Sequence, residues 1–354
     1  IEEFLKGKNG CLLAYGQTGA GKTHTMNGND TARGIIPRVV DSIFTHALST
    51  EASVEFSICC SYVEIYNEKI RDLLDIEKNN LNLRTSSTEG RTDIIGSTQI
   101  YVTSQDEMNE VMERGNNNRK VAATGMNAGS SRSHSLFLID LIQANESSGI
   151  KLSSRLVLVD LAGSEMVRKT GAKGDRLEEA KSINRSLSAL GNVINALTEE
   201  RSRSHVPYRD SKLTYLLQKS LGGDCKALMF CNLSPNVNSQ GESLCSLRFA
   251  KKVNACERNY IEKGLVGSDG NDIILISDVD EIPNLENLDQ NNIDNKIILF
   301  KQDMFYYKFN LRLPDLIWTG TKACKKKMLR SPQWLRNIKD KKYSFFRLDT
   351  IFSK

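Results

Sequence analysis

Apolar runs and helical repeats alternate along the first two thirds of this 354-residue chain. Residues 11–15 form a short apolar run, and residues 54–64 are rich in β-branched and aromatic side chains, so both are predicted strands. Residues 34–44 begin with Gly-Ile-Ile-Pro, which places a proline in the tolerated first turn of a predicted helix. Residues 67–74 also show helical spacing. This alternation predicts an α/β fold.

The same alternation continues to residue 256. Residues 136–139, 155–160 and 226–235 have the composition of strands, and residues 242–256 that of a helix. Between them lies a longer stripe in which apolar residues recur every three or four positions. Its members are Leu177, Ala180, Ile183, Leu187, Leu190, Ile194 and Leu197. On pattern alone the stripe is a helix face that packs into a core.

Composition indicates a soluble globular protein of about two domains. The chain is 39% hydrophobic and 26% charged, and its net charge of +5 is too small to indicate a nucleic acid or an anionic membrane as partner. No apolar run approaches the roughly 20 residues that span a bilayer, and the first residues do not resemble a signal peptide. Because the chain does not begin with Met, we expect a piece of a longer protein. Eight cysteines without a CxxC pair indicate reduced thiols in a cytosolic protein rather than disulfides.

The segment GQTGAGKT matches the phosphate-loop pattern, in which two glycines flank four residues and are followed by Lys and Thr. Its residues are Gly16, Gln17, Thr18, Gly19, Ala20, Gly21, Lys22 and Thr23. The glycines allow backbone N–H groups to face phosphate oxygens. Lys22 would bridge the outer phosphates, and the Thr23 hydroxyl would bind Mg²⁺. A plain Gly-rich surface loop is the alternative, but the strand before the segment and the helix after it favour a nucleotide site.

Two further segments carry polar residues next to predicted strands. The hydroxyl-rich sequence NAGSSRSH covers residues 127–134, and Asp160 ends the strand that precedes LAGSE. An Asp at the carboxyl end of a buried strand is where a phosphate-loop enzyme holds Mg²⁺. Gly163 could donate its N–H to the terminal phosphate. Arg132 and Glu165 carry opposite charges, and we expect them to pair as a latch between the two loops.

Together, GQTGAGKT, NxxSSRSH and DLAGSE resemble the nucleotide motifs of the kinesin motor domain. The resemblance covers residues 1–256 and implies the P-loop NTPase-like motor fold, a mixed central sheet flanked by helices, with ATP and Mg²⁺ as its ligands. It implies that Ser130 and Ser131 touch the metal shell and the attacking water. It also implies that Gly163 and Glu165 report phosphate loss to the helix formed by the apolar stripe. We therefore predict a microtubule-dependent ATP hydrolase of the cytoplasm and cytoskeleton.

A local basic cluster follows that helix. It consists of Arg201, Arg203, Arg209 and Lys212. By itself such a cluster is usually a solvated face, but the resemblance implies a contact with the acidic surface of tubulin.

The chain departs from the family in three ways. The strands and the adenine-contacting segment that open the family's domain are absent, so we expect an open sheet edge beside residues 226–233 and a weakened adenine site. Tyr215 stands where the family often carries a basic residue. Neither a neck linker nor a heptad repeat follows residue 256, so no machinery for stepping or dimerisation is expected.

Residues 257–354 form a predicted second domain of different composition. The sequence ILISDVDEIP places Asp278 and Asp280 after an apolar strand, and such a DxD pair suits a divalent metal on a sugar-nucleotide diphosphate. A solvated acidic turn is the alternative. The longer match with WTGTKACKKKMLRSPQWLR resembles part of glycosyltransferase family 17, which implies Mn²⁺ or Mg²⁺ and a UDP-sugar. The basic residues that would then contact phosphate or acceptor are Lys325, Lys326, Lys327 and Arg330.

Three hypotheses follow. The first is an ATP-dependent microtubule motor, truncated at its start and fused to the glycosyltransferase-like fragment. The second is a metal-dependent N-acetylglucosaminyltransferase that acts on N-glycan mannose and carries a motor relic. The third is a non-functional chimeric gene product, since one family works in the cytosol and the other in the Golgi lumen.

Overall fold

The computed structural model describes residues 1–29, 31–86, 90–125, 130–165, 175–198, 205–222, 225–260, 269–276, 297–299, 302–306, 311–318 and 322–338. Its contacts divide the chain into two compact units, Ile1–Val253 and Asn254–Lys354, and each is described by itself.

The first unit is built on a nine-stranded sheet with the strand order β5-β4-β3-β2-β7-β8-β1-β9, in which β6 also pairs with β2. The strands are β1 (Gly10–Tyr15), β2 (Val54–Tyr66), β3 (Lys69–Asp72), β4 (Asn79–Thr85), β5 (Thr92–Ile95), β6 (Ile100–Val102), β7 (His134–Asn145), β8 (Lys151–Asp160) and β9 (Lys226–Cys231). β1 runs parallel to both β8 and β9, whereas β2 and β7 pair antiparallel over twelve residues. The predicted mixed central sheet is therefore confirmed.

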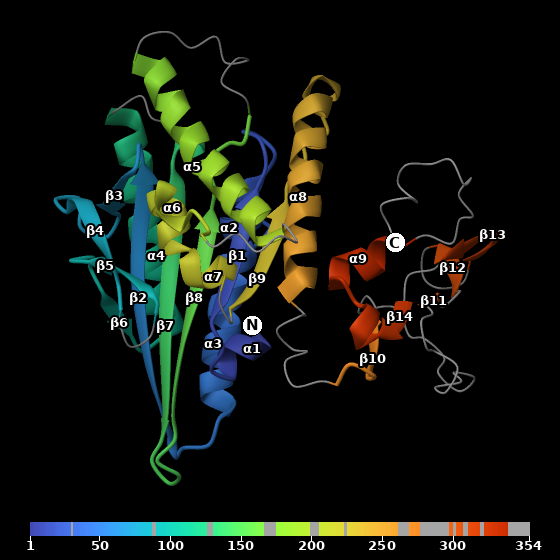
Figure 1. Ribbon diagram of the computed structural model, residues 1–354. Helices are drawn as coiled ribbons and strands as arrows, with labels where there is room; N and C mark the ends of the chain where they lie inside the picture. The colour runs from blue at the N-terminus through green and yellow to red at the C-terminus, as the bar shows by residue number, and fades with distance from the viewer. Residues whose placement is uncertain are drawn as a thin grey trace. The chain divides into compact units, whose positions relative to one another are not determined.

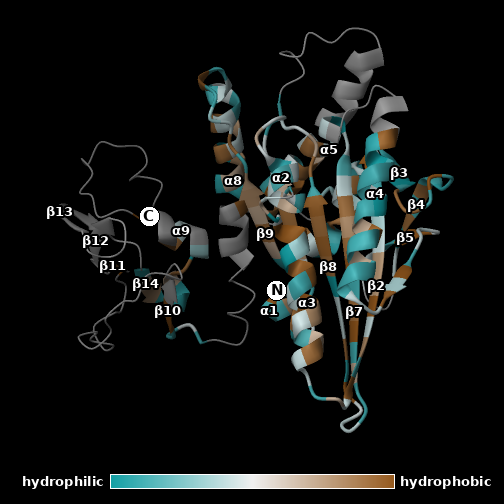
Figure 2. Cartoon of the chain, turned by 180° about the vertical axis from the view of Figure 1, so that it is seen from behind, coloured by the Kyte–Doolittle hydropathy of each residue, from teal (hydrophilic) through white to brown (hydrophobic). Residues whose placement is uncertain are grey.

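Helices cover both faces of this sheet: α3 and α4 lie on one face and α5, α6 and α7 on the other (Figures 1 and 2). The helices are α1 (Glu2–Leu5), α2 (Lys22–Asn27), α3 (Ile35–Ser49), α4 (Gln105–Gly125), α5 (Asp175–Thr198), α6 (Lys212–Leu216), α7 (Gln218–Gly222) and α8 (Gln240–Tyr260), with short 3-10 turns η1 (Ser130–Arg132), η3 (Tyr208–Asp210) and η4 (Val237–Ser239). α8 packs near β1, where Phe249 stacks on Tyr15 with ring centroids 4.4 Å apart.

The main core lies between the sheet and the α3–α4 layer. Val40 and Ile43 of α3 and Met108 of α4 pack against Phe137 and Ile139 of β7, and all five are buried. Figure 2 shows the corresponding hydrophobic colouring along the strands behind these helices. Burial of apolar area of this kind supplies most of the driving force for folding.

Most predicted elements are confirmed, but the helix predicted over residues 67–74 is wrong. Asn67 and Glu68 adopt positive φ values of 50° and 56°, and the chain then returns as β3 antiparallel to β2. Two residues in the left-handed region form the tight hairpin turn that matches strand twist. Ile70 is fully buried on this hairpin, so the short apolar spacing belonged to a strand.

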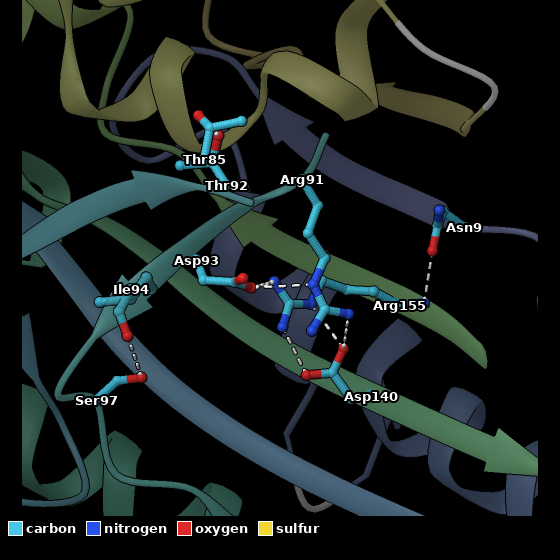
Figure 3. Close-up of polar contacts among 9 residues, drawn as sticks. All are labelled: Asn9, Thr85, Arg91, Thr92, Asp93, Ile94, Ser97, Asp140 and Arg155. Carbon is cyan, nitrogen blue, oxygen red and sulfur yellow. Dashed lines mark hydrogen bonds and ion pairs between the residues drawn. The ribbon is translucent and has the colours of Figure 1, made fainter. Parts of the chain in front are cut away.

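An ion cluster ties β8 to β7 and β5 (Figure 3). The Arg155 guanidinium contacts Asp140 through Nε and Nη2, both at 2.7 Å, and Asp93 through Nη1 at 2.9 Å. Arg91 approaches Asp93 as well, with its Nε 3.1 Å from Oδ1. Burial acts to lower the pKa of Arg155, but the hydrogen bonds and negative charges of Asp140 and Asp93 outweigh it and raise the pKa. The cluster thus bonds β8 to its neighbour β7 and also to β5, which lies further along the strand order.

β9 ends the sheet, because among the described strands it pairs only with β1. Leu228 on this edge is 51% exposed. Within the described ranges, the outer edge of β9 therefore has no strand paired to it, in line with the expected open edge beside residues 226–233.

The second unit contains two small sheets. The first has the order β10 (Ile273–Ile276), β14 (Lys322–Lys325), β11 (Ile298–Leu299), and the second pairs β12 (Gln302–Tyr306) with β13 (Leu311–Trp318). The turn η7 (Lys326–Met328) and the helix α9 (Pro332–Asn337) follow, and Ile274, Cys324 and Leu335 form a small core. The predicted metal ligands Asp278 and Asp280 lie outside the described residues. Throughout the described ranges, no helix is both long enough and apolar enough to span a membrane.

Candidate nucleotide-binding site

The phosphate loop connects β1 to α2, as the sequence predicts. Gly16 has φ +152°, and a Cβ there would lie 2.2 Å from the Asn232 carbonyl oxygen, so only glycine fits. Gly21 has φ +94° and immediately precedes α2, and a Cβ there would meet no atom within 4 Å. The loop therefore passes close to the β9 end on one side and remains open on the other.

Lys22 lies under this loop and is buried. Its Nζ donates to the carbonyl oxygens of Gly16 at 2.8 Å and Gln17 at 2.9 Å. Burial lowers the pKa of Lys22, and the negative charges of Asp160 and Glu165 oppose that effect. The ammonium is thus held at the loop, where an anion bound to the loop would meet it.

Asp160 and Thr23 come together as a candidate Mg²⁺ site. Asp160 ends β8 and is 4% exposed, and its Oδ2 accepts a hydrogen bond from Thr23 Oγ1 at 2.8 Å. Within the described part of the chain, the buried Oδ1 of Asp160 has no hydrogen-bond partner. A buried carboxylate oxygen without a donor needs a cation or water. Carboxylate and hydroxyl oxygens are also ligands that suit Mg²⁺, so these residues fit that ion.

The backbone after Asp160 is held by three successive N–H groups. The N–H of Ala162 donates to His134 Nδ1 at 3.0 Å, that of Gly163 to the Ser131 carbonyl at 2.8 Å, and that of Ser164 to the Gly16 carbonyl at 3.1 Å. The Gly163 N–H thus joins the loop of NAGSSRSH, the first switch, to the segment DLAGSE, the second switch, and its predicted contact with a phosphate stays a prediction. Ser130 and Ser131 lie in η1 beside this junction, and their contact with metal and water stays a prediction.

Glu165 is bonded to the phosphate loop. Its carboxylate accepts hydrogen bonds from the Thr18 N–H at 2.8 Å and from the Thr18 hydroxyl at 2.5 Å. The predicted ion pair between Glu165 and Arg132 stays a prediction. An outward-facing N–H of a phosphate-binding loop is a strong donor to an anion, which accounts for this contact with the carboxylate.

Arg119 on α4 is a site residue that the sequence analysis missed. It is 4% exposed, and its Nη1 donates to Asp160 Oδ2 at 2.9 Å and its Nη2 to the Ser133 carbonyl at 3.2 Å. Its Nε lies 3.8 Å from the buried carboxylate of Glu64. Glu64, between the apolar Val63 and Ile65 of β2, was the available signal, because a buried carboxylate requires a cationic partner.

His134, the first residue of β7, is also buried in this region, with 2% exposure. Its Nδ1 accepts from Ala162, so the proton of the neutral ring is on Nε2, which lies 2.7 Å from Ser186 Oγ on α5. Burial, and then the positive charges of Arg119 and Lys22, lower the pKa of His134 from 6.5 to about 3.

We expect the free energy of unfolding to fall by about 2 kcal/mol between pH 7 and pH 5 through His134 alone. The unfolded chain binds a proton at this residue below pH 6.5, whereas the folded chain does so only near pH 3. Protonation therefore favours the unfolded state as the pH falls. Urea unfolding at several pH values would measure the slope. His134→Asn should remove that component, while the exposed control His24→Asn should keep it; an unchanged slope in His134→Asn would contradict the assignment.

The structure describes half of the predicted basic cluster. Arg209 in η3 is exposed, and its guanidinium lies 5.5 Å from the centre of the Tyr215 ring. Lys212 begins α6, where its N–H donates to Glu68 Oε2 at 2.7 Å. Arg201 and Arg203 lie outside the described residues. Tyr215, the departure noted in the sequence, accepts a hydrogen bond from Thr85 at 3.0 Å and so is part of the α6 packing.

Comparisons with known proteins match the same part of the chain. A family model described as the kinesin motor domain matches residues 1–256. The kinesin heavy chain of Neurospora crassa is 52% identical over 257 residues, which are 72% of this chain and 28% of that protein. The kinesin heavy chain isoform 5A of Homo sapiens is 50% identical over 257 residues, 72% of this chain and 25% of that protein. The chain thus spans about a quarter of the length of these curated relatives.

Solved structures agree with the sequence matches. The structure of a fast kinesin has a TM-score of 0.68 and 52% identity, and the match covers 71% of this chain and 72% of that chain. The Kar3Vik1 motor structure has a TM-score of 0.64 and 42% identity, covering 72% of this chain and 65% of that chain. Because the family model matches well over half of the chain and the sheet carries the family's loop and switch motifs, this chain belongs to the kinesin motor domain family.

Proposed function

We propose that residues 1–256 bind Mg·ATP, hydrolyse its terminal phosphate bond and couple this cycle to microtubule binding and movement. The observation that carries the proposal is the convergence of three parts on one loop. Lys22 donates to Gly16, Ser164 donates to the same carbonyl, and the Thr23 hydroxyl meets Asp160. The phosphate loop is thus bonded to Lys22 and to Ser164 of the DLAGSE segment, and it lies next to the pair Thr23–Asp160. A loop with these contacts is suited to sense a terminal phosphate.

Each residue has a role in this proposal. The Lys22 ammonium neutralises the outer phosphates, and the main-chain N–H groups of residues 16–23 hold their oxygens. Thr23 and Asp160 would hold Mg²⁺, which supplies charge neutralisation at the phosphate being transferred. Ser130 and Ser131 position the attacking water, and Glu165 and Arg132 respond to phosphate loss. In this reading Glu165 leaves Thr18 when a phosphate group takes up the N–H of the loop.

We further propose the acidic surface of tubulin as the partner and the cytoplasmic cytoskeleton as the place of action. The exposed Arg209 and the neighbouring Lys212 support this part, together with Arg201 and Arg203 in the sequence. Positive charge on one loop and helix end would speed association with an anionic filament and make it sensitive to salt.

Steady-state ATP turnover of the full chain, with and without microtubules, tests the proposal. We expect Mg²⁺-dependent turnover that microtubules stimulate, and co-pelleting with microtubules that is stronger with a non-hydrolysable ATP analogue than with ADP. Arg209→Ala should weaken pelleting, whereas Lys6→Ala at an exposed position remote in sequence should not. Absence of both Mg·ATP binding and nucleotide-dependent pelleting would refute the motor function.

A second candidate concerns residues 257–354 only. The strand β10, Ile273–Ile276, directly precedes Asp278 and Asp280, which supports a DxD-type site for Mn²⁺ or Mg²⁺ and a UDP-sugar. Titration of the full chain with UDP in the presence of Mn²⁺ tests this activity, which Asp280→Ala should abolish. Absence of metal-dependent UDP binding would favour the hypothesis of a non-functional chimeric gene product. Long-read sequencing of the transcript across codons 250 to 265 would test whether the two parts are joined in one transcript.

A further inference from the structure

The imidazole of His134 joins the backbone of the second switch, the DLAGSE segment of residues 160–165, to the helix α5. His134 Nδ1 accepts from the Ala162 N–H at 3.0 Å, and His134 Nε2 lies 2.7 Å from Ser186 Oγ. The three residues come from β7, from the segment after β8, and from α5. All are at most 4% exposed, so water does not compete for these hydrogen bonds.

Ala162 lies next to the residues that contact the phosphate loop and the first switch, so its bond to His134 can respond to their movement. The next two N–H groups, of Gly163 and Ser164, donate to Ser131 and to Gly16 of the phosphate loop. A displacement of Gly163 or Ser164 toward a bound phosphate would pull on Ala162, because planar peptide units leave only φ and ψ of the intervening residues to absorb the movement. Of these three N–H groups, only that of Ala162 reaches a side chain that also contacts α5.

The protonation state makes the link directional. Since Nδ1 is an acceptor, the neutral ring can donate only from Nε2, and the Ser186 hydroxyl is then the acceptor. The cations Arg119 and Lys22 face this region and oppose a second proton on the ring. The ring therefore keeps one tautomer at neutral pH. A displacement of Ala162 then rotates or shifts the imidazole, and with it the Nε2–H group that donates to Ser186.

We propose that His134 is a positioning residue that transmits displacement of the second switch to α5 through its two ring nitrogens. The inference rests on the proposed motor function for its consequence, because α5 would carry the change toward the filament-binding surface. The chemistry is a relay of hydrogen bonds with no covalent step.

Two substitutions separate the halves of the relay. Ser186→Ala removes the acceptor on α5 and leaves Ala162 bonded to His134. In His134→Asn, the amide oxygen occupies the place of Nδ1 along the side chain, so the Ala162 bond can persist while the reach to Ser186 is lost. Ser188→Ala, at an exposed position two residues along α5, is the matched control.

In the full chain, we expect Ser186→Ala to keep basal ATP turnover within about two-fold and to reduce the microtubule-stimulated kcat by about ten-fold, the effect of roughly one hydrogen bond. His134→Asn should reduce stimulation similarly. The double variant should be no worse than either single variant, because both substitutions remove the same contact, between His134 Nε2 and Ser186 Oγ. Ser188→Ala should match the unmodified chain. Full stimulation in Ser186→Ala, or an equal loss of basal and stimulated turnover, would overturn the proposal.

Hydrogen exchange provides a readout that does not depend on microtubules. We expect amide protection in α5 to differ between the Mg·ADP and non-hydrolysable ATP states of the unmodified chain, and Ser186→Ala to remove that difference. If microtubules fail to stimulate the chain but this difference and its loss are observed, the relay stands and the motor function fails. If the α5 difference persists in Ser186→Ala, the relay is wrong whatever the motor assay gives.

Discussion

Replacing Lys22 with alanine is expected to lower the Mg·ATP turnover of the chain by at least about 100-fold. The ammonium is buried at the loop, where it donates to the Gly16 and Gln17 carbonyls. Because the effective dielectric constant is low there, its electrostatic attraction to a bound phosphate is strong. Without it, charge that develops on the terminal phosphate oxygens loses a fixed positive partner. Turnover at saturating ATP and the affinity for a fluorescent ADP analogue would measure the two contributions separately.

His24→Ala is the matched control, because His24 lies two residues further along α2 and is exposed. It should change turnover by less than about two-fold. A Lys22→Ala chain that retains more than a tenth of the unmodified turnover would contradict the role given to this lysine.

Replacing Arg119 with methionine is expected to reduce the free energy of unfolding by about 3–5 kcal/mol. Methionine keeps much of the volume, but it leaves the carboxylates of Asp160 and Glu64 buried without their cation. The same substitution should weaken Mg²⁺-dependent nucleotide binding, because Asp160 loses one of the two donors to its Oδ2. Urea unfolding gives the first quantity, and nucleotide affinity as a function of Mg²⁺ concentration gives the second.

Lys120→Ala, at the adjacent exposed position of α4, controls for the loss of a positive charge and should change stability by less than about 0.5 kcal/mol. Arg119→Lys should fall between the two, because lysine keeps the charge but cannot present two donors in fixed directions. If Arg119→Met unfolds at the same urea concentration as the unmodified chain, the buried ion network does not stabilise the fold.

The parts of the site that lie close together in the sequence were predictable. The phosphate loop is continuous, and its glycines, lysine and threonine are placed by one strand and one helix. Asp160 was also predictable, because the end of an apolar strand in an α/β sheet faces the same edge as the loop.

Contacts between distant segments were not predictable in the same way. Arg119 follows three asparagines in the sequence and resembles a residue of a solvated helix. Only the packing of α4 against the sheet brings it to Glu64 and Asp160. The bond from the Thr18 N–H to Glu165 was also not predictable, since main-chain donors leave no trace in the residue types.

Short elements were the other source of error. Residues 67–74 are compatible with helical spacing, but the first two of them adopt the left-handed conformation and form a hairpin turn. Eight residues carry too few periods to separate the two structures, and the long partner strand β2 supplies the missing information. By contrast, the stripe over residues 177–197 covers several turns and corresponds to α5.

The hydrogen bond from Thr23 to Asp160 has a consequence for the order of events at the site. The hydroxyl proton of Thr23 is already committed to the carboxylate, so the oxygen lone pairs point away from Asp160. The orientation of the hydroxyl is thus set by folding, and a divalent ion bound here would meet an oxygen that need not reorient. Binding of a cation at this position would therefore require a side chain that donates a hydrogen bond to Asp160 and offers lone pairs to the cation. Neither valine nor alanine can do so.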